Sequence, residues 1–97
     1  MEQEIVHLAL ESLERETGIV GRWTEGGPID GEIDFIINNQ NLHYFVEVKR
    51  EVRPHQIAQL LKYRNQFNNV LLIAERIFPK VKVELRELQF PYLETNG

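Results

Sequence analysis

The sequence predicts an α/β domain in which a mixed β-sheet is flanked by helices. Three observations lead to this prediction. An amphipathic segment opens the chain, two short apolar runs joined by a polar turn lie in its middle, and a second amphipathic segment precedes one continuous apolar run. Apolar residues at helical spacing therefore alternate with short runs rich in β-branched and aromatic residues, as in strands between helices. We expect the order helix, three strands, helix, strand, and then a short helix and a last strand.

The first helix is expected over residues 2–17, where the apolar side chains form one broad stripe at helical spacing. Gly18 follows the last turn and is a C-terminal stop signal. Residues 19–23 are short and apolar at alternate positions, which predicts a strand, and the glycine-rich residues 25–28 predict a turn.

Two further strands are expected over residues 33–37 and 42–49, joined as a hairpin by the polar residues 38–41. Side chains alternate between the two faces of a strand. One face of this hairpin is therefore predicted to be apolar throughout, through Ile33, Phe35, Ile37, Tyr44, Val46 and Val48.

The other face of the hairpin carries charges. If Asn38 closes the turn opposite His43, Asp34 lies opposite Glu47, and Lys49 follows on the same face. A charge at a core-facing strand position is costly unless it is paired, bound to a metal or functional. We therefore expect Asp34, Glu47 and Lys49 to form a site at one end of the sheet.

In the second half of the chain, a helix is expected to begin at Pro54, a residue that is tolerated at the first helical position. The continuous apolar run 70–74 predicts a strand covered on both faces. Residues 79–88 predict a short helix, although the alternation within 81–85 leaves a strand as the alternative. Residues 90–95 are expected to form the last strand.

The composition bounds the class of protein. With 97 residues, the chain fits one domain spanning residues 1–97, either complete or the N-terminal part of a longer protein. It has no cysteine, no signal peptide pattern and no apolar run long enough to span a membrane, so we expect a cytoplasmic protein without a membrane partner. The net charge of −4 argues against tight non-specific binding to nucleic acid, although the basic residues cluster after residue 48.

Two carboxylates on one sheet face repel each other unless a cation lies between them. A hard divalent ion such as Mg²⁺ or Mn²⁺ prefers oxygen ligands and retains water. Asp34, Glu47 and the backbone carbonyl of Val48 are the expected ligands. Lys49 would position the nucleophile or stabilise negative charge on a phosphate.

The arrangement of Asp34, twelve further residues and then Glu47-Val48-Lys49 resembles the PD-(D/E)XK nuclease superfamily, and most closely its small resolvase-like members. The resemblance implies a restriction endonuclease-like αβββαβ core, with Asp34 and Glu47 as metal ligands and Lys49 as the catalytic lysine. The sequence departs from the pattern at Ile33, where the superfamily name has proline. Glu2 and Glu11 are both open candidates for the first-helix glutamate that many members use.

The second helix adds Gln59 and Tyr63, which are similar to the QxxxY motif of RecB-like members and imply support of the site and contact with DNA. The nearby Arg50, Arg53 and Lys62 are expected to contact phosphates. The tail from Phe78 to Asn96-Gly97 resembles regulators of AbiEi-type toxin–antitoxin systems.

The expected function is a Mg²⁺-dependent DNA endonuclease that hydrolyses phosphodiester bonds, with branched or junction DNA as a candidate substrate. The alternative is a non-catalytic DNA-binding or transcriptional regulatory module that keeps the nuclease fold, and a third is an interaction domain. The small size of the domain predicts a homodimer or an additional C-terminal domain for substrate recognition.

Overall fold

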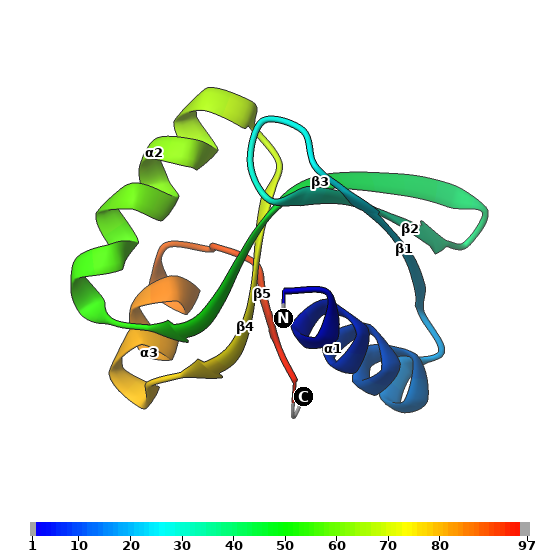
Figure 1. Ribbon diagram of the computed structural model, residues 1–97, viewed down its shortest axis with the longest axis horizontal. Helices are drawn as coiled ribbons and strands as arrows, with labels where there is room; N and C mark the ends of the chain where they lie inside the picture. Colours follow the sequence, from blue (N-terminus) through cyan, green and yellow to red (C-terminus); the bar gives the residue numbers. More distant parts are fainter. Residues whose placement is uncertain (1, 96–97) are drawn as a thin grey trace.

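The computed structural model describes residues 2–95; Met1 and the tail residues Asn96 and Gly97 lie outside the described part. The protein is a mixed α/β domain with three helices and one five-stranded sheet (Figure 1), so the predicted class and order of elements are confirmed. The sequence left a helix or a strand possible near residues 79–88, and the structure has a helix at residues 79–87. The elements are α1 (Glu2–Thr17), β1 (Val20–Glu25), β2 (Gly31–Ile37), β3 (Gln40–Val52), the 3₁₀ turn η1 (Pro54–Gln56), α2 (Ile57–Phe67), β4 (Val70–Ile77), α3 (Pro79–Glu87) and β5 (Tyr92–Glu94).

The strands lie in the order β1-β2-β3-β4-β5. β1, β2 and β3 form an antiparallel meander, whereas β4 pairs parallel with β3, and β5 pairs parallel with β4. A parallel neighbour requires a crossover connection, and α2 provides it between β3 and β4. The long strand β3 is thus the centre of the sheet, with a neighbour of each orientation.

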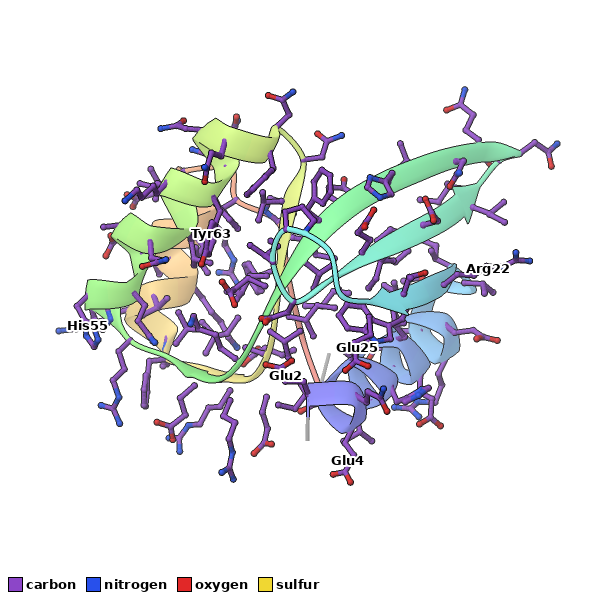
Figure 2. The ribbon with its side chains drawn as sticks, turned by 45° about the horizontal axis from the view of Figure 1, so that its top comes forward. Glu2, Glu4, Arg22, Glu25, His55 and Tyr63 are labelled. Atoms are coloured by element: carbon purple, nitrogen blue, oxygen red, sulfur yellow. The ribbon has the colours of Figure 1, made fainter. Side chains whose placement is uncertain are left out.

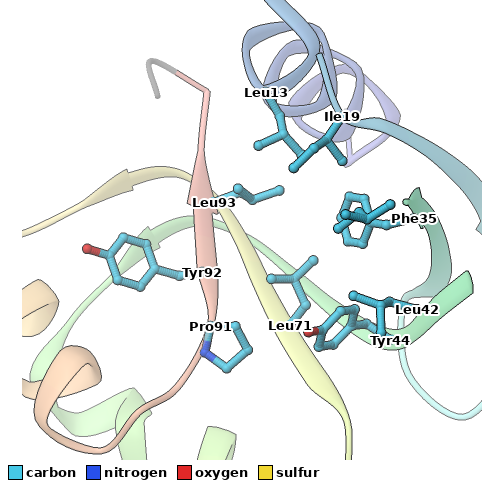
Figure 3. A pocket seen from close by; sticks show the side chains of 10 residues that line it. Leu13, Ile19, Phe35, Leu42, Tyr44, Leu71, Pro91, Tyr92 and Leu93 are labelled. Carbon is cyan, nitrogen blue, oxygen red and sulfur yellow. The ribbon is translucent and has the colours of Figure 1, made fainter. Parts of the chain in front are cut away.

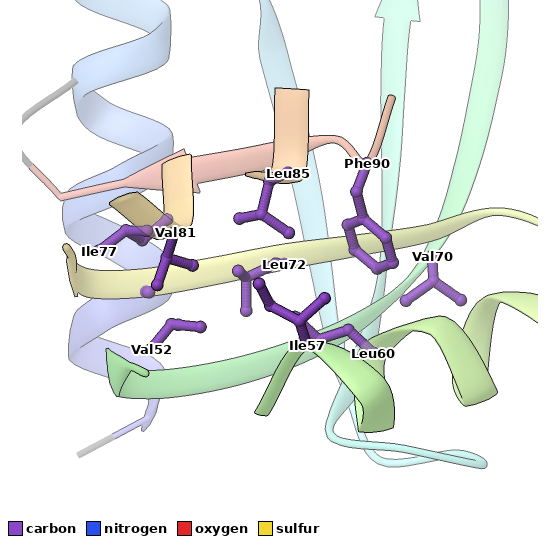
Figure 4. Packing of buried hydrophobic residues seen from close by; sticks show 10 residues of the cluster. Val52, Ile57, Leu60, Val70, Leu72, Ile77, Val81, Leu85 and Phe90 are labelled. Atoms are coloured by element: carbon purple, nitrogen blue, oxygen red, sulfur yellow. The ribbon is translucent and has the colours of Figure 1, made fainter. Parts of the chain in front are cut away.

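Helices cover both faces of the sheet. α1 packs on one face, and α2 and α3 pack on the other (Figure 1). The face under α1 buries the apolar side of the hairpin, including Ile33, Phe35, Val46 and Val48, as the alternation predicts. The opposite face is filled where α2 and α3 cover it (Figure 4), by Val52, Ile57, Leu60, Val70, Leu72, Ala74, Ile77, Val81, Leu85 and Phe90.

The hairpin between β2 and β3 turns on two residues. Asn38 and Asn39 both have positive φ angles, 52° and 64°. This backbone is that of a two-residue type I′ turn, which asparagine tolerates and which matches the twist of the strands. Gln40 and Asn41, predicted to belong to the turn, are therefore paired strand residues.

The short turn changes the register that the sequence predicts. Asp34 lies opposite His43 rather than opposite Glu47. The shift is by an even number of residues, so every side chain stays on its predicted face while the pairs slide along the strands. The predicted pairing of Asp34 with Glu47 is therefore wrong.

No helix within residues 2–95 has both the length and the apolar character needed to cross a membrane.

Candidate functional site

The carboxylate that the structure brings to Glu47 is that of Asp30. β2 begins at Gly31, opposite Val46, so β3 continues past the end of its antiparallel partner. The side chain of Ile29 packs into the apolar cluster under α2 and α3 and anchors the loop there. Beyond the start of β2, a side chain takes the place of a strand partner: the Val48 backbone N–H donates a hydrogen bond of 2.8 Å to Asp30 Oδ2. The aspartate is thus held beside β3 at the level of Glu47.

Glu47 is a buried carboxyl group, with 8% of its surface exposed. Burial raises its pKa to about 7, and a hydrogen bond with Asp30 and the charge of Asp30 add to the rise. Lys49 and a hydrogen bond with Tyr63 act in the opposite direction. At neutral pH, two carboxyl groups therefore share a confined site in which Glu47 readily holds a proton.

Tyr63 joins the site from α2. Its hydroxyl group accepts a hydrogen bond of 3.0 Å from Gln59 Nε2, one helical turn earlier. Because the same hydroxyl is a hydrogen-bond partner of Glu47, Gln59, Tyr63 and Glu47 form a chain of contacts from the helix surface to the site. The structure thus brings together Glu47 and the two α2 residues that the sequence selects.

Of the two first-helix candidates, Glu2 is the one whose pKa is shifted by residues of the site. Partial burial raises its pKa, the nearby carboxylates of Asp30 and Glu25 raise it further, and Lys49 lowers it. Figure 2 shows Glu2 and Glu25 close together, at the start of α1 and the end of β1. Glu11, the other candidate, instead lines a hollow between α1 and β1 with Trp23.

Asp34 is not brought to Glu47. Its neighbours across the sheet are Arg22 on β1 and His43 on β3, and it lines a surface hollow with Arg22 near the hairpin turn. The sequence contained a signal for this outcome. An Asn-Asn pair is typical of a two-residue hairpin turn, and such a turn at Asn38 places Glu47 level with Asp30.

The predicted basic residues occupy different places. Lys49 lies on the same face of β3 as Glu47, and its positive charge lowers the pKa of Glu47. Arg50 and Arg53 follow it along and after β3 and are exposed. Lys62 is exposed on α2, where it is a surface residue adjacent in sequence to Tyr63.

A divalent cation fits the donor set of this site. Two carboxylates held side by side, one of which retains a proton near neutral pH, are a place where a cation can replace that proton. Among residues 2–95 there is no group of three or more His, Asp or Glu side chains in a metal-binding arrangement. Mg²⁺ commonly binds through one or two carboxylates, with waters and substrate phosphates completing its coordination. Asp30 and Glu47 would hold it, and the predicted participation of the Val48 carbonyl stays a prediction.

A further hollow lies on the α1 side of the sheet and is lined mainly by apolar side chains. It has a volume of about 200 Å³ and opens between α1, the hairpin and β5 (Figure 3). Its lining is apolar apart from the two tyrosine hydroxyl groups. The lining residues are Leu13, Ile19, Phe35, Ile37, Leu42, Tyr44, Leu71, Pro91, Tyr92 and Leu93.

Comparison with known proteins adds no relative. No family model matches the chain, and no curated protein or solved structure matches it either.

Proposed function

We propose that this protein is a metal-dependent DNA endonuclease of the PD-(D/E)XK type with a restriction endonuclease-like fold. One observation carries the proposal. Asp30 and Glu47 meet at the point where β3 outlasts β2, with Lys49 two residues beyond Glu47 on the same strand face. This is the acid, acid and lysine set that the sequence suggested, with Asp30 in the role expected of Asp34.

The residues of the site would have different roles in phosphodiester hydrolysis. Asp30 and Glu47 would bind Mg²⁺ or Mn²⁺, which when bound lowers the pKa of a water and offsets charge on a phosphate. Asp30 is oriented for this task by the Val48 N–H. Tyr63 orients Glu47 and favours its charged form.

Lys49 supplies the positive charge that the two carboxylates lack. Its charge lowers the pKa of both Glu47 and Glu2, which supports a role beside the carboxyl groups. From there it can donate hydrogen bonds to a phosphoryl oxygen, where negative charge grows in the transition state. Replacing it should therefore reduce the rate more than the affinity for nucleic acid.

The experiment compares two aspartates on the same sheet face. Asp30→Asn and Asp34→Asn are tested beside the wild type for stabilisation by Mn²⁺ and for cleavage of labelled duplex, single-stranded and four-way-junction DNA. We expect Mn²⁺ to raise the melting temperature of the wild type and of Asp34→Asn, but not of Asp30→Asn. Cleavage should follow the same pattern and be lost in Lys49→Ala. If Asp34→Asn loses Mn²⁺ stabilisation and cleavage as fully as Asp30→Asn does, the result would favour Asp34 as the metal ligand, as the sequence alone predicts.

A non-catalytic DNA-binding or regulatory module is the second candidate. The resemblance of the tail from Phe78 onward to AbiEi-type regulators favours it, whereas the net charge of −4 weakens non-specific nucleic-acid binding in either candidate. Binding of DNA without cleavage in Mn²⁺, unaffected by Lys49→Ala, would support this candidate. A homodimer or a further C-terminal domain stays a prediction, which measurement of the mass in solution would test.

A further inference from the structure

Three arginines and a phenylalanine gather beyond the site, at the carboxyl ends of β3 and β4. The guanidinium carbon of Arg53 lies 5.4 Å from the centre of the Phe78 ring, and that of Arg76 lies 5.0 Å from the same centre. Arg50 and Arg76 line one surface hollow together. We call Arg50, Arg53, Arg76 and Phe78 the arginine cluster.

The parallel pairing of β3 and β4 creates this cluster from segments far apart in the sequence. Lys49 pairs with Ala74 and Glu51 pairs with Arg76, so Arg76 lies just past Lys49 along the sheet. Arg53 follows the end of β3 directly, and Phe78 follows the end of β4 directly. The arginine cluster therefore lies beyond Glu47 and Lys49 in the direction of β3.

The charges in the cluster are only partly compensated. Glu51 forms an ion pair of 3.0 Å with Arg53, and Glu75 lines the hollow with Arg50 and Arg76. Within residues 2–95, neither Arg50 nor Arg76 forms an ion pair. Holding several guanidinium groups near one another is unfavourable unless an anion neutralises them, so the cluster is suited to a polyanion.

The surface on the other side of the site carries two carboxylates, Glu32 and Asp34, with Arg22 beside Asp34. Glu32 and Asp34 lie on the same face of the sheet as Glu47, farther toward the hairpin turn. Glu32 is held by a hydrogen bond of 2.6 Å with His43, and its carboxylate remains partly exposed. A phosphate backbone that approaches Glu47 is thus attracted toward the arginine cluster and repelled from the β2 surface.

We propose that the arginine cluster binds an unpaired, single-stranded segment of the nucleic acid next to the phosphodiester in the site. The inference rests on the proposed nuclease function for its position and on the cluster for its chemistry. A single strand presents unpaired bases as well as phosphates; arginine can bind the phosphates and stack on the bases, and an aromatic ring can stack on the bases. In a duplex the bases are paired and stacked, so their faces are not available to the guanidinium groups and the ring.

The test measures binding without cleavage. Labelled oligothymidine and a labelled duplex are titrated with the full chain in the presence of a chelator, and binding is followed by fluorescence anisotropy. The cluster variant is Arg53→Gln/Arg76→Gln. Its matched control is Arg15→Gln/Arg22→Gln, which removes the same two charges from exposed positions on α1 and β1. Phe78→Leu removes the ring and keeps an apolar side chain.

We expect the wild type to bind the single strand more tightly than the duplex. The cluster variant should weaken single-strand binding by about tenfold at low salt and lower the slope of log affinity against log salt by roughly one for each lost phosphate contact. The control pair should change affinity by less than about threefold. Phe78→Leu should weaken single-strand binding and leave duplex binding unchanged. Equal losses in the two double variants, or tighter binding of duplex by the wild type, would overturn the proposal.

Failure of this inference is separable from failure of the proposed function. If Mn²⁺-dependent cleavage is absent but the cluster variant still loses single-strand binding, the binding role of the arginine cluster is supported and the proposed nuclease activity is not. If cleavage depends on Asp30 and Lys49 but single-strand binding is unaffected by the cluster variant, the enzyme stands and the surface is wrong. Melting temperatures of all variants, measured in the same buffer, establish that each one is folded.

Discussion

Glu47→Gln should remove a pH dependence of stability that the site builds into the fold. The pKa of Glu47 is raised from an ordinary value of 4.5 to about 7, mainly by burial. Between these two pH values, the folded chain keeps a proton that the unfolded chain has released. The free energy of unfolding therefore falls as the pH rises from about 4.5 to about 7, and it stays low above that range. Glutamine is neutral throughout and can still donate a hydrogen bond to Asp30 as the protonated carboxyl does.

The size of the effect follows from the same pKa values. One pKa unit corresponds to about 1.4 kcal/mol, so the full difference between 4.5 and about 7 corresponds to about 3 kcal/mol. Solvent at the open side of the site screens part of the charge interaction, and we expect about 1–2 kcal/mol. A change of this size is a large fraction of the stability of a small domain.

The assay is urea denaturation followed by circular dichroism, at about pH 5 and about pH 8, for the wild type and Glu47→Gln. The variant should lose less stability than the wild type between the two pH values and should be the more stable protein at the higher pH. Glu11→Gln, an exposed change on α1, is the control and should keep the wild-type pH dependence. An unchanged pH dependence in Glu47→Gln would refute the account of two carboxyl groups confined together.

Three other changes test the surroundings of the site and the core. Tyr63→Phe removes a hydrogen bond that favours charged Glu47, so the pH above which Mn²⁺ stabilises the protein should move upward, as thermal melts across a pH series would show. Leu60→Ala empties a fully buried position between α2 and the sheet and should cost about 2–4 kcal/mol in urea denaturation; a loss below about 1 kcal/mol would contradict the packing. Gly31→Ala would bring a Cβ atom into collision with the Trp23 ring, so we expect a loss of about 1–3 kcal/mol and an altered tryptophan emission, and a variant with wild-type emission and stability would argue against this close approach.

Much of the fold could be predicted because local chemistry and global packing agree in this chain. Helical spacing, the glycine after the first helix and Pro54 mark elements that the structure contains. The apolar face of the hairpin was also predictable, since alternation along a strand survives any even shift in register. β3 and β4 extend beyond their predicted ends because pairing between neighbouring strands continues through charged residues such as Glu51 and Arg76.

The choice of aspartate was not predictable by the same means. Asp30, Glu32 and Asp34 recur at every second residue, so alternation places all three carboxylates on the face of Glu47. Only the turn decides which of them lies level with Glu47, and a turn of two residues selects Asp30. The sequence favoured Asp34 because the spacing of residues along the chain does not reveal how many of them form the turn.

The sequence by itself determined the α/β class, the order of the elements and the two faces of the hairpin, because these depend on the periodicity of apolar residues along each segment. The tertiary structure decided what meets across segments. It brought Asp30 to the charged face of β3, placed the hydroxyl of Tyr63 against Glu47, and gathered Arg53 and Arg76 around Phe78. Such meetings depend on strand register and on the docking of helices, and these are set by the packing of the whole domain.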